Sequence, residues 1–531
     1  MKSKINIFFS LLILFFIFIQ DSFSQPHTEW VQRFNSPENY NVYVSDMAVD
    51  NSGNVYLTGY VSVNDTNQNY VTIKYDPQGE QKWVRYYDGP DHREDKPTAI
   101  AVDDSGNVIV SGSSYSNNSS YDFLTIKYNS NGDSLWTRRY TSGLLVRAMK
   151  LDNLGNIIVT GTNIIGDIIT TKYSYFGLQE WSKIFNGKGN GYDDPHSISV
   201  DFNNNIYING FSFNSSGSVT LKYDPKGNEI WNRYFFASWY YIDVDTTGNI
   251  YCGGVTLGNG IDYCVLKYNS LGDTIWSRKY DSGNITNNND DSREMYVDKQ
   301  GNVTITGVNS PDLHDFDIAT VKYNTDGETI WSHKYIGINS SNEDSKGVIG
   351  DKFGNIYIGG VTNDAQLSLK YLIIKYNFSG NQQWVEKYDN NPQTSHSIRK
   401  IKIDSSGSIY ITGIATGYGI SQDILTIKYS TMTEYNNPIH LIPIDFKLYQ
   451  NYPNPFNPKT TINYDLPVLS TVSLKVFNII GKEIYTLVKE KQNAGKYDYV
   501  FDGSDLTSGI YFYTLSANGL IISTKKLILL K

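Results

Sequence analysis

A ten-residue pattern that recurs along most of the chain constrains the fold more than any other feature. From Asp103 it reads DDSGNVIVSG, and near copies end in Gly at 59, 112, 161, 210, 254, 307, 360 and 413, a spacing of 44 to 53 residues. The Gly-Asn pair provides a backbone that can adopt positive φ, and the following Val, Ile and Tyr suit a buried, pleated strand. The sequence therefore predicts a repeat protein in which each unit contains a turn followed by a strand.

A second pattern runs in step with the first. From Lys127 to Tyr140 the chain reads KYNSNGDSLWTRRY, which predicts a strand, a glycine turn and another strand. Each unit then holds four strands, and in the second unit we expect them at 98–102, 107–112, 123–128 and 134–140. A four-stranded antiparallel unit of this length cannot bury both faces alone, but radial stacking buries them, so we expect propeller blades; a solenoid is the alternative.

The two ends of the repeat region complement each other. The Trp of the second pattern recurs at 83, 136, 181, 231, 276, 331 and 384, and a further copy, Trp30, precedes the first unit. The last unit stops after Tyr429 and lacks its own Trp strand. We therefore predict that the Trp30 strand completes the last sheet and closes a ring of eight four-stranded blades, which leaves no strand edge unpaired.

The first residues have the composition of an export signal. Lys2 and Lys4 precede an apolar run from Ile5 to Ile19, and small residues lead to a cleavage site after Ser24. A retained membrane anchor is the alternative, although the run is short for a span. Removal of residues 1–24 changes the formal net charge from −9 to −10, and this acidic balance argues against nucleic-acid binding.

Composition supports an all-β fold. The chain has 43 Tyr and 44 Gly, and no segment shows a helical period. Its two cysteines, Cys252 and Cys264, fall on neighbouring expected strands, so they could form a local disulfide or remain as two buried thiols. Clustered His or further Cys that would complete a metal site are absent from the sequence, so we predict no metal.

The repeat resembles a bacterial β-propeller family, known by the abbreviation SBBP. Its signature is Asp-x-x-Gly-Asn-x-Tyr-x-Thr-Gly followed by Lys-Tyr and Trp, which this chain carries with variation, such as Asn203-Asn204-Asn205 and Ser408, over about residues 28–430. The resemblance implies a propeller at 25–430. Members of the family are commonly seven-bladed, so the count of eight departs from it.

Residues that recur in most units are interpreted as structural. An Asp five positions before the Lys of Lys-Tyr is expected to cap a turn by accepting backbone N–H groups; it stands at Asp122, Asp167, Asp262, Asp317 and Asp423. The recurring Trp is expected to pack between blades.

Function is therefore sought in the exceptions, which are expected in loops at one face of the ring. They are His92, Arg93, Asp193, Asp194, His196, Trp239, Tyr240, Arg293 and His314. Together they would line a polar central pocket for a carbohydrate or a peptide. Ordinary solvated loop polarity is the alternative interpretation.

Catalytic motifs are not evident. The sequence contains no nucleophile elbow, phosphate loop or zinc motif, and acid–base chemistry would depend on carboxylates. The spacing of Gly79 and Trp83 is similar to the Trp-docking repeats of eight-bladed quinoprotein dehydrogenases, but the adjacent Cys pair general in those enzymes is absent. We predict no cofactor and favour binding over catalysis.

The pattern changes after Tyr429. Residues 431–445 read as a linker, and three Pro between Pro453 and Pro458 introduce a domain at 446–531. Alternating strands are expected at 460–464, 472–478, 483–488, 495–501, 509–515 and 520–530. These strands predict a small antiparallel sandwich of immunoglobulin-like size.

This tail resembles the type A C-terminal sorting domain of the type IX secretion system of Bacteroidetes and their relatives. The matching residues are Asn451, Tyr452, Pro453, Asn454, Pro455, Phe456, Asn457, Pro458, Gly509, Tyr511, Lys525 and Lys526. The resemblance implies passage through the periplasm and transport across the outer membrane by the type IX machinery. The protein would be secreted or attached to the outer cell surface.

The sequence thus predicts a secreted or cell-surface propeller that binds a glycan or protein ligand or serves in adhesion, with no membrane span after signal cleavage. Two alternatives remain: an extracellular enzyme that cleaves polysaccharide or peptide on a propeller scaffold, and a structural protein of the surface layer.

Overall fold

A computed structural model describes residues 25–64, 66–116, 120–213, 217–257, 260–281, 289–312, 315–337, 341–363, 368–388, 395–416, 421–430, 446–467, 470–492 and 495–531. The expected signal peptide (1–24) and linker (431–445) lie outside them. The chain divides into two compact units, 1–432 and 433–531. Regular elements in the described ranges are all β-strands, and no helix among them is long and apolar enough to span a membrane.

The first unit consists of four-stranded antiparallel groups, which we call blades. Blade 1 contains β2 (Asn41–Val49), β3 (Val55–Ser62), β4 (Gln68–Tyr75) and β5 (Gln81–Tyr87), and blade 2 contains β6 (Asp95–Val102), β7 (Val108–Ser116), β8 (Ser120–Tyr128) and β9 (Ser134–Tyr140). Blade 3 contains β10 (Gly143–Leu151), β11 (Ile157–Asn163), β12 (Ile168–Tyr173) and β13 (Gln179–Phe185), and blade 4 contains β14 (Asp193–Val200), β15 (Ile206–Ser212), β16 (Gly217–Tyr223) and β17 (Glu229–Phe235).

The remaining blades repeat this order. Blade 5 contains β18 (Ser238–Val244), β19 (Ile250–Leu257), β20 (Ile261–Tyr268) and β21 (Thr274–Tyr280), and blade 6 contains β22 (Asn289–Val297), β23 (Val303–Asp312), β24 (Asp315–Tyr323) and β25 (Thr329–Tyr335). Blade 7 contains β26 (Glu343–Gly350), β27 (Ile356–Asn363), β28 (Leu369–Tyr376) and β29 (Gln382–Tyr388), and blade 8 contains β30 (His396–Ile403), β31 (Ile409–Thr416), β32 (Gln422–Ser430) and β1 (His27–Phe34). One parallel pair, Ile261 with Asn289, joins blades 5 and 6.

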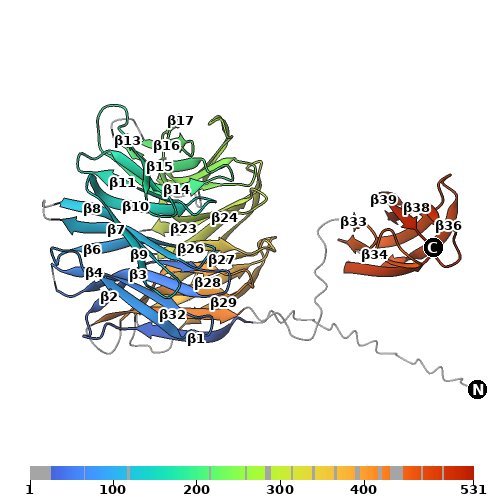
Figure 1. Cartoon of the computed structure of the whole chain (residues 1–531), viewed down its shortest axis with the longest axis horizontal. Helices are drawn as coiled ribbons and strands as arrows, with labels where there is room; N and C mark the ends of the chain where they lie inside the picture. Colours follow the sequence, from blue (N-terminus) through green and yellow to red (C-terminus); the bar gives the residue numbers. More distant parts are fainter. Residues whose placement is uncertain are drawn as a thin grey trace, which may run out of the picture. The chain divides into compact units, whose positions relative to one another are not determined.

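The last blade confirms the predicted clasp. β1 pairs antiparallel with β32, and Trp30 lies opposite Lys428. The Trp30 indole N–H donates to the carbonyl of Pro77 in blade 1 at 3.1 Å. Strands from the two ends of this unit, blue and orange in Figure 1, therefore share one sheet. This pairing closes the ring.

The Asp turn that opens each second strand forms as the sequence predicted. In blade 1, one Asp50 oxygen accepts the backbone N–H groups of Ser52 and Asn54, both at 2.9 Å. The Asn54 amide donates to the other oxygen at 2.7 Å, and Gly53 takes a φ of 81°. The carboxylate thus satisfies the turn's donors without a ligand.

The second turn holds neighbouring blades together. The Trp83 indole N–H donates to the carbonyl of Ser130 in the next blade at 3.1 Å. A Cβ on Gly132 would lie 2.8 Å from the Trp83 ring, so only Gly allows this contact. Arg85 donates to the Gly132 carbonyl at 2.7 Å. The Trp therefore serves packing between blades, as expected.

The recurrent Asp of the third strand has a different partner from the one expected. Asp122 accepts from Arg139 at 3.0 Å, and Asp262 forms an ion pair with Lys279 at 2.6 Å. The predicted turn cap is wrong at these positions because the fourth strand places a cation opposite the carboxylate. The same pairing joins Asp423 to Arg33 across the clasp at 3.3 Å.

The two cysteines are free and buried. Burial raises the pKa of the Cys252 thiol to about 12 and that of Cys264 to about 11. Both thiols are consequently protonated at neutral pH and unreactive.

The second unit packs two sheets around one core. One sheet orders β33 (Lys447–Leu448), β34 (Lys459–Leu466) and β37 (Gly495–Asp502); the other orders β36 (Glu483–Gln492), β35 (Ser470–Phe477), β38 (Gly509–Ala517) and β39 (Leu520–Leu529). Ile462, Leu474 and Leu515 from both sheets are fully buried in that core. The expected sandwich forms, and its likeness to immunoglobulin domains stays a prediction.

The Pro-rich motif of this unit docks on its last strand. Asn454 receives the Ile528 N–H at 2.9 Å and donates to the Lys526 carbonyl at 3.0 Å. The buried Asn451 side chain donates to Thr460 at 2.9 Å, and Phe456 is buried. These contacts explain why the motif needs amide side chains and an aromatic at fixed positions.

Candidate functional site

The first strands of the eight blades form the inner wall of the first unit. β2, β6, β10, β14, β18, β22, β26 and β30 contact one another in cyclic order, and β30 contacts β2 to complete the circle. Side chains on the face of this wall that points away from the blade cores therefore share one central space.

Each inner strand carries a β-bulge at the same place. The extra residue is unpaired with the second strand. We call these eight residues the bulge ring: Ser45, Thr98, Arg147, His196, Tyr240, Arg293, Lys346 and Arg399. The residue before each one is buried, whereas every member of the ring keeps exposed surface.

The Gly that ends the recurring motif is explained by this bulge. An added Cβ on Gly161 would lie 2.0 Å from the Leu145 carbonyl oxygen, and on Gly413 it would lie 2.0 Å from that of Ser397. Neither Gly has positive φ. Glycine is therefore required because the bulged inner strand approaches too closely for any side chain.

Polar contacts link the bulge ring from blade to blade. Arg147 pairs with Asp194 through two hydrogen bonds of 2.8 Å, and Arg293 pairs with Asp344 at 3.1 Å. His196 bonds the Trp239 carbonyl at 2.7 Å through Nδ1. Its ring lies 5.5 Å from that of Tyr240. The ring thus offers aromatic and cationic groups side by side.

Six charged side chains lie beside the bulge ring on the same wall. They are one or three residues after a bulge residue, and we call them the axial charges: Asp46, Lys150, Asp243, Glu294, Lys400 and Lys402. Glu294 in blade 6 interacts electrostatically with Lys400 and Lys402 in blade 8. Lys402 also interacts with Lys150 across the ring. Interactions between blades that are not neighbours in the ring place these charges in the common central space.

Enclosure by protein perturbs these groups. Burial raises the pKa of Glu294 and of Asp243, although nearby lysines oppose the change. Burial lowers the pKa of Lys402. The neighbouring Asp46 carboxylate raises the pKa of Lys400, whose Nζ lies 4.0 Å from it.

The structure brings four of the predicted site residues together and moves them from loops to strands. Asp194, His196, Tyr240 and Arg293 lie on the inner wall. The expected loop placement is wrong because the inner strands begin earlier than the sequence suggested.

Two other predicted residues are fully buried. Asp193 accepts the Gly187 N–H at 2.6 Å and has no exposed surface. Trp239 is also at 0 % exposure and stacks on Phe235 at 5.3 Å. Neither side chain is available to a ligand, since each fills the interior of its blade.

The remaining predicted residues lie apart from the bulge ring. Exposed His92 pairs with Asp88 at 2.8 Å, in the loop before β6. Arg93 covers the Tyr115 ring at 4.3 Å. His314 lies outside the described residues.

Sequence reasoning missed Arg147, Lys346 and Arg399. A signal for them exists: each bulge residue lies fourteen positions before the last Gly of its motif, as Ser45 does before Gly59 and Arg399 before Gly413. Alignment of the units on that Gly identifies the whole ring.

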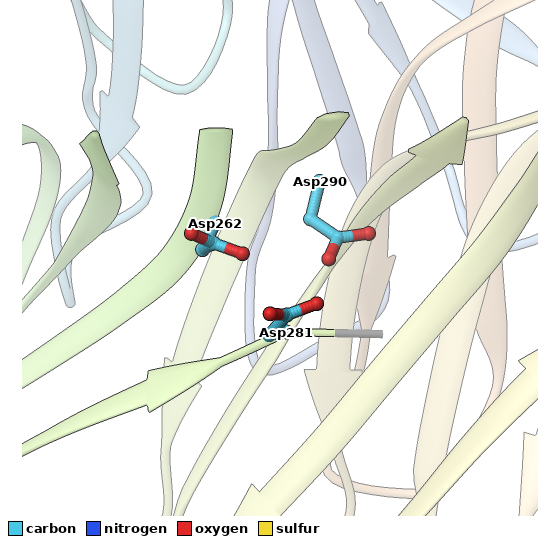
Figure 2. A group of neighbouring side chains, drawn as sticks. All are labelled: Asp262, Asp281 and Asp290. Atoms are coloured by element: carbon cyan, nitrogen blue, oxygen red, sulfur yellow. The ribbon is translucent and has the colours of Figure 1, made fainter. Parts of the chain in front are cut away.

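A separate group of carboxylates lies between blades 5 and 6. Figure 2 shows Asp262, Asp281 and Asp290 facing one another, with oxygens within 4.8 Å. Asp262 is neutralised by Lys279, and Asp290 accepts from Asn309 at 2.8 Å. Calcium takes six to eight oxygen ligands. These contacts account for the cluster as part of the blade framework, and the absence of a metal stays a prediction.

Solved structures resemble the chain at low identity. The WD40 domain of SCAP from fission yeast is 11% identical, covering 76% of this chain and 98% of that one with a TM-score of 0.42. Polysaccharide lyase Uly1 is 10% identical over 75% of this chain and 93% of its own, with a TM-score of 0.41. A protein of unknown function from Bacteroides caccae is 12% identical, over 53% and 93%, with a TM-score of 0.32. None of these similarities carries a functional argument.

Sequence families give more specific matches. No curated protein matches the chain. Residues 29–65 match the family described as Beta-propeller repeat, SBBP, which agrees with the four-stranded units and the resemblance found in the sequence. Residues 450–530 match the family described as Secretion system C-terminal sorting domain. The chain therefore carries a match to an SBBP repeat at its first blade strands and a match to a type IX sorting domain at its end, and the latter indicates export to the cell surface or secretion.

Proposed function

We propose that the exported protein is a binding or adhesion module that takes its ligand at the bulge ring. The observation that carries the proposal is the contrast between two neighbouring positions of the inner strands. Two residues after each bulge the side chain is apolar in all eight blades and packs inward: Met47, Ile100, Met149, Ile198, Ile242, Met295, Val348 and Ile401. The bulge position itself holds six different residue types.

Packing explains the uniform position but places no demand on the varied one. A side chain that leaves the blade at a bulge touches no core, so its identity is free to serve recognition. Arg147, His196 and Tyr240 come from three successive blades and add a guanidinium, an imidazole and a phenol to one stretch of wall. This mixture suits the hydroxyl groups and apolar faces of a carbohydrate, or the backbone and side chains of a peptide.

A binding screen with matched variants tests the proposal. The full mature chain is screened on glycan and peptide arrays, and each hit is titrated against His196→Ala/Tyr240→Ala. The control is Phe176→Ala/Phe202→Ala, which removes two aromatics that are 75% and 87% exposed in turns outside the inner wall.

We expect a saturable ligand whose affinity falls about tenfold or more in the first variant, because each lost contact contributes about 1 kcal/mol, and is unchanged in the control. A blank screen, or equal binding by both variants, would contradict the proposal.

One observation favours a catalytic alternative. Burial raises the pKa of Glu294, a shift in the direction that favours a general acid, and the Asp46 side chain lies within its electrostatic reach. Polysaccharide or peptide cleavage by the wild-type chain that is abolished in Glu294→Gln would establish an enzyme. Size-exclusion chromatography that shows multimers without ligand would instead support a structural surface-layer role.

A further inference from the structure

We infer that the inner wall of blades 8 and 1 binds the anionic group of an acidic polysaccharide, with Arg399 and Lys402 as its cationic ligands. The inference rests on the proposed function and names the ligand class. It follows from the charge distribution on one inner strand and from the aromatic surface beside it.

The inner strand β30 has the sequence HSIRKIKI. Arg399 belongs to the bulge ring, and Lys400 and Lys402 are axial charges, so three cations of one strand reach the central space. Each of the other inner strands contributes at most two cations, as the printed sequence shows.

Two of these cations have no carboxylate partner in an ion pair among the described residues. Arg399 is exposed, and its hydrogen bond within the described chain goes to the neutral Ser45 carbonyl at 3.4 Å. Among the described residues no carboxylate forms an ion pair with Lys402, although protein surrounds it. Asp46 and Glu294 act on Lys402 through space but form no ion pair with it, so an anion from solution would be stabilised there.

The nearby carboxylates do not neutralise this strand. Asp46 is already shared, because it accepts the Ile100 N–H at 3.1 Å and faces Lys400 at 4.0 Å. Glu294 lies in blade 6 and acts electrostatically on Lys400 and Lys402, but among the described residues it forms no ion pair with either. Arg399 and Lys402 are therefore left without an ion pair in the part of the chain that the structure describes.

Aromatic side chains beside the cations favour a saccharide over a free anion. Tyr43 and Tyr60 of blade 1 stack at 4.8 Å and are partly exposed. Arg399 lies close enough to act electrostatically on Tyr60, and Lys96 covers the Tyr60 ring at 5.4 Å. Aromatic surface beside a cationic patch suits sugar rings that carry carboxylate or sulfate groups.

Isothermal titration calorimetry with the full mature chain tests this. The acidic probes are oligogalacturonate and dextran sulfate; the matched neutral probes are methyl-esterified oligogalacturonate and dextran; sodium sulfate is the free anion. The variant is Arg399→Gln/Lys402→Gln. The control is Lys299→Gln/Lys352→Gln, which removes the same charge from exposed residues of two Asp turns.

We expect an acidic probe to bind and its affinity to fall about tenfold or more in the variant, since a hydrogen bond to a charged group contributes about 1.5–3 kcal/mol. The control should bind as the wild type does, and added salt should weaken binding. Should the double variant fail to fold by circular dichroism, Arg399→Gln alone retains the test, because that side chain is exposed.

Three results with the polysaccharide probes would overturn the inference: no binding of either acidic probe, equal binding of acidic and neutral probes, or acidic binding unaffected in the variant. Equal binding that is lost in His196→Ala/Tyr240→Ala would leave the proposed function intact. Sodium sulfate that binds as tightly as the acidic oligomers would refute the polysaccharide.

Discussion

Substitution of Gly413 by Ala should both destabilise the propeller and disturb Arg399. Gly413 ends the motif in blade 8 and lies opposite Ile398, next to the bulge. A Cβ there would stand 2.0 Å from the Ser397 carbonyl oxygen and 2.8 Å from Ile398 Cα. Ordinary carbon–oxygen contacts are about 3.3 Å or longer, so the inner strand would have to retreat by more than about 1 Å.

The cost can be worked from that displacement. The clash is with backbone, which cannot rotate away as a flexible side chain could. Inserting a methyl group into a packed site costs about 1–3 kcal/mol, and each ladder hydrogen bond lost costs about 1 kcal/mol. We therefore expect Gly413→Ala to lower the free energy of unfolding by about 3 kcal/mol, a large part of the 5–15 kcal/mol typical of a folded protein.

Gly360→Ala provides a graded control in the neighbouring blade. Its added Cβ would meet the Asp344 carbonyl oxygen at 2.7 Å, a milder clash. Urea unfolding followed by far-ultraviolet circular dichroism should place Gly413→Ala well below Gly360→Ala, and hydrogen exchange should show faster opening of β30. If the two variants were equally stable, the bulge would not be the reason for the glycine.

Three further predictions follow from single contacts. Trp231→Phe removes an indole N–H that donates to the next blade at 3.2 Å, and thermal unfolding should show a loss of about 1–2 kcal/mol. Burial alone would raise the pKa of Asp152, but hydrogen bonds from Asn156 and Lys172 outweigh it and hold the pKa below its usual value. Its stabilisation is thus present above the unfolded pKa, about 3.9, and is lost as pH falls through the folded value, so Asp152→Asn should flatten the acid limb of a pH–stability curve. Asn451→Ala should strip the buried Asn from the sorting unit and lower both its thermal stability and the amount of exported protein.

Repeat spacing was sufficient to predict the architecture because each signal is local and occurs many times. The Asp turns, the Gly turns and the Trp contacts each depend on a few adjacent residues. Even ring closure was predictable, since Trp30 and the missing eighth Trp strand are complementary. This long-range pairing could be predicted because each end of the repeat region carries an incomplete copy of the repeat.

The site was predicted only in part because a bulge leaves no composition signal of its own. One extra residue shifts the alternation of side chains by one position. A regular strand would bury His196 and expose Asp193, whereas the bulge buries Asp193 and leaves His196 on the exposed face of the inner wall. Asp193 was consequently predicted as a ligand-binding residue, although its side chain is buried. Counted from the bulge, Asp193 occupies the position of Asp95 in blade 2 and Glu343 in blade 7, where the carboxylate also accepts the N–H of a preceding glycine.

The same geometry explains how one fold can accept different ligands. Turn, Trp and glycine residues hold each blade, and none of them reaches the central space. A bulge residue protrudes there without a core contact, so a change at Arg399 should alter binding of the proposed ligand and leave packing almost unaffected. A change at Gly413 moves the strand that displays Arg399, so it should lower stability and disturb Arg399 together. Variants at Arg399 should therefore affect binding with little loss of stability, whereas variants at Gly413 should affect both properties.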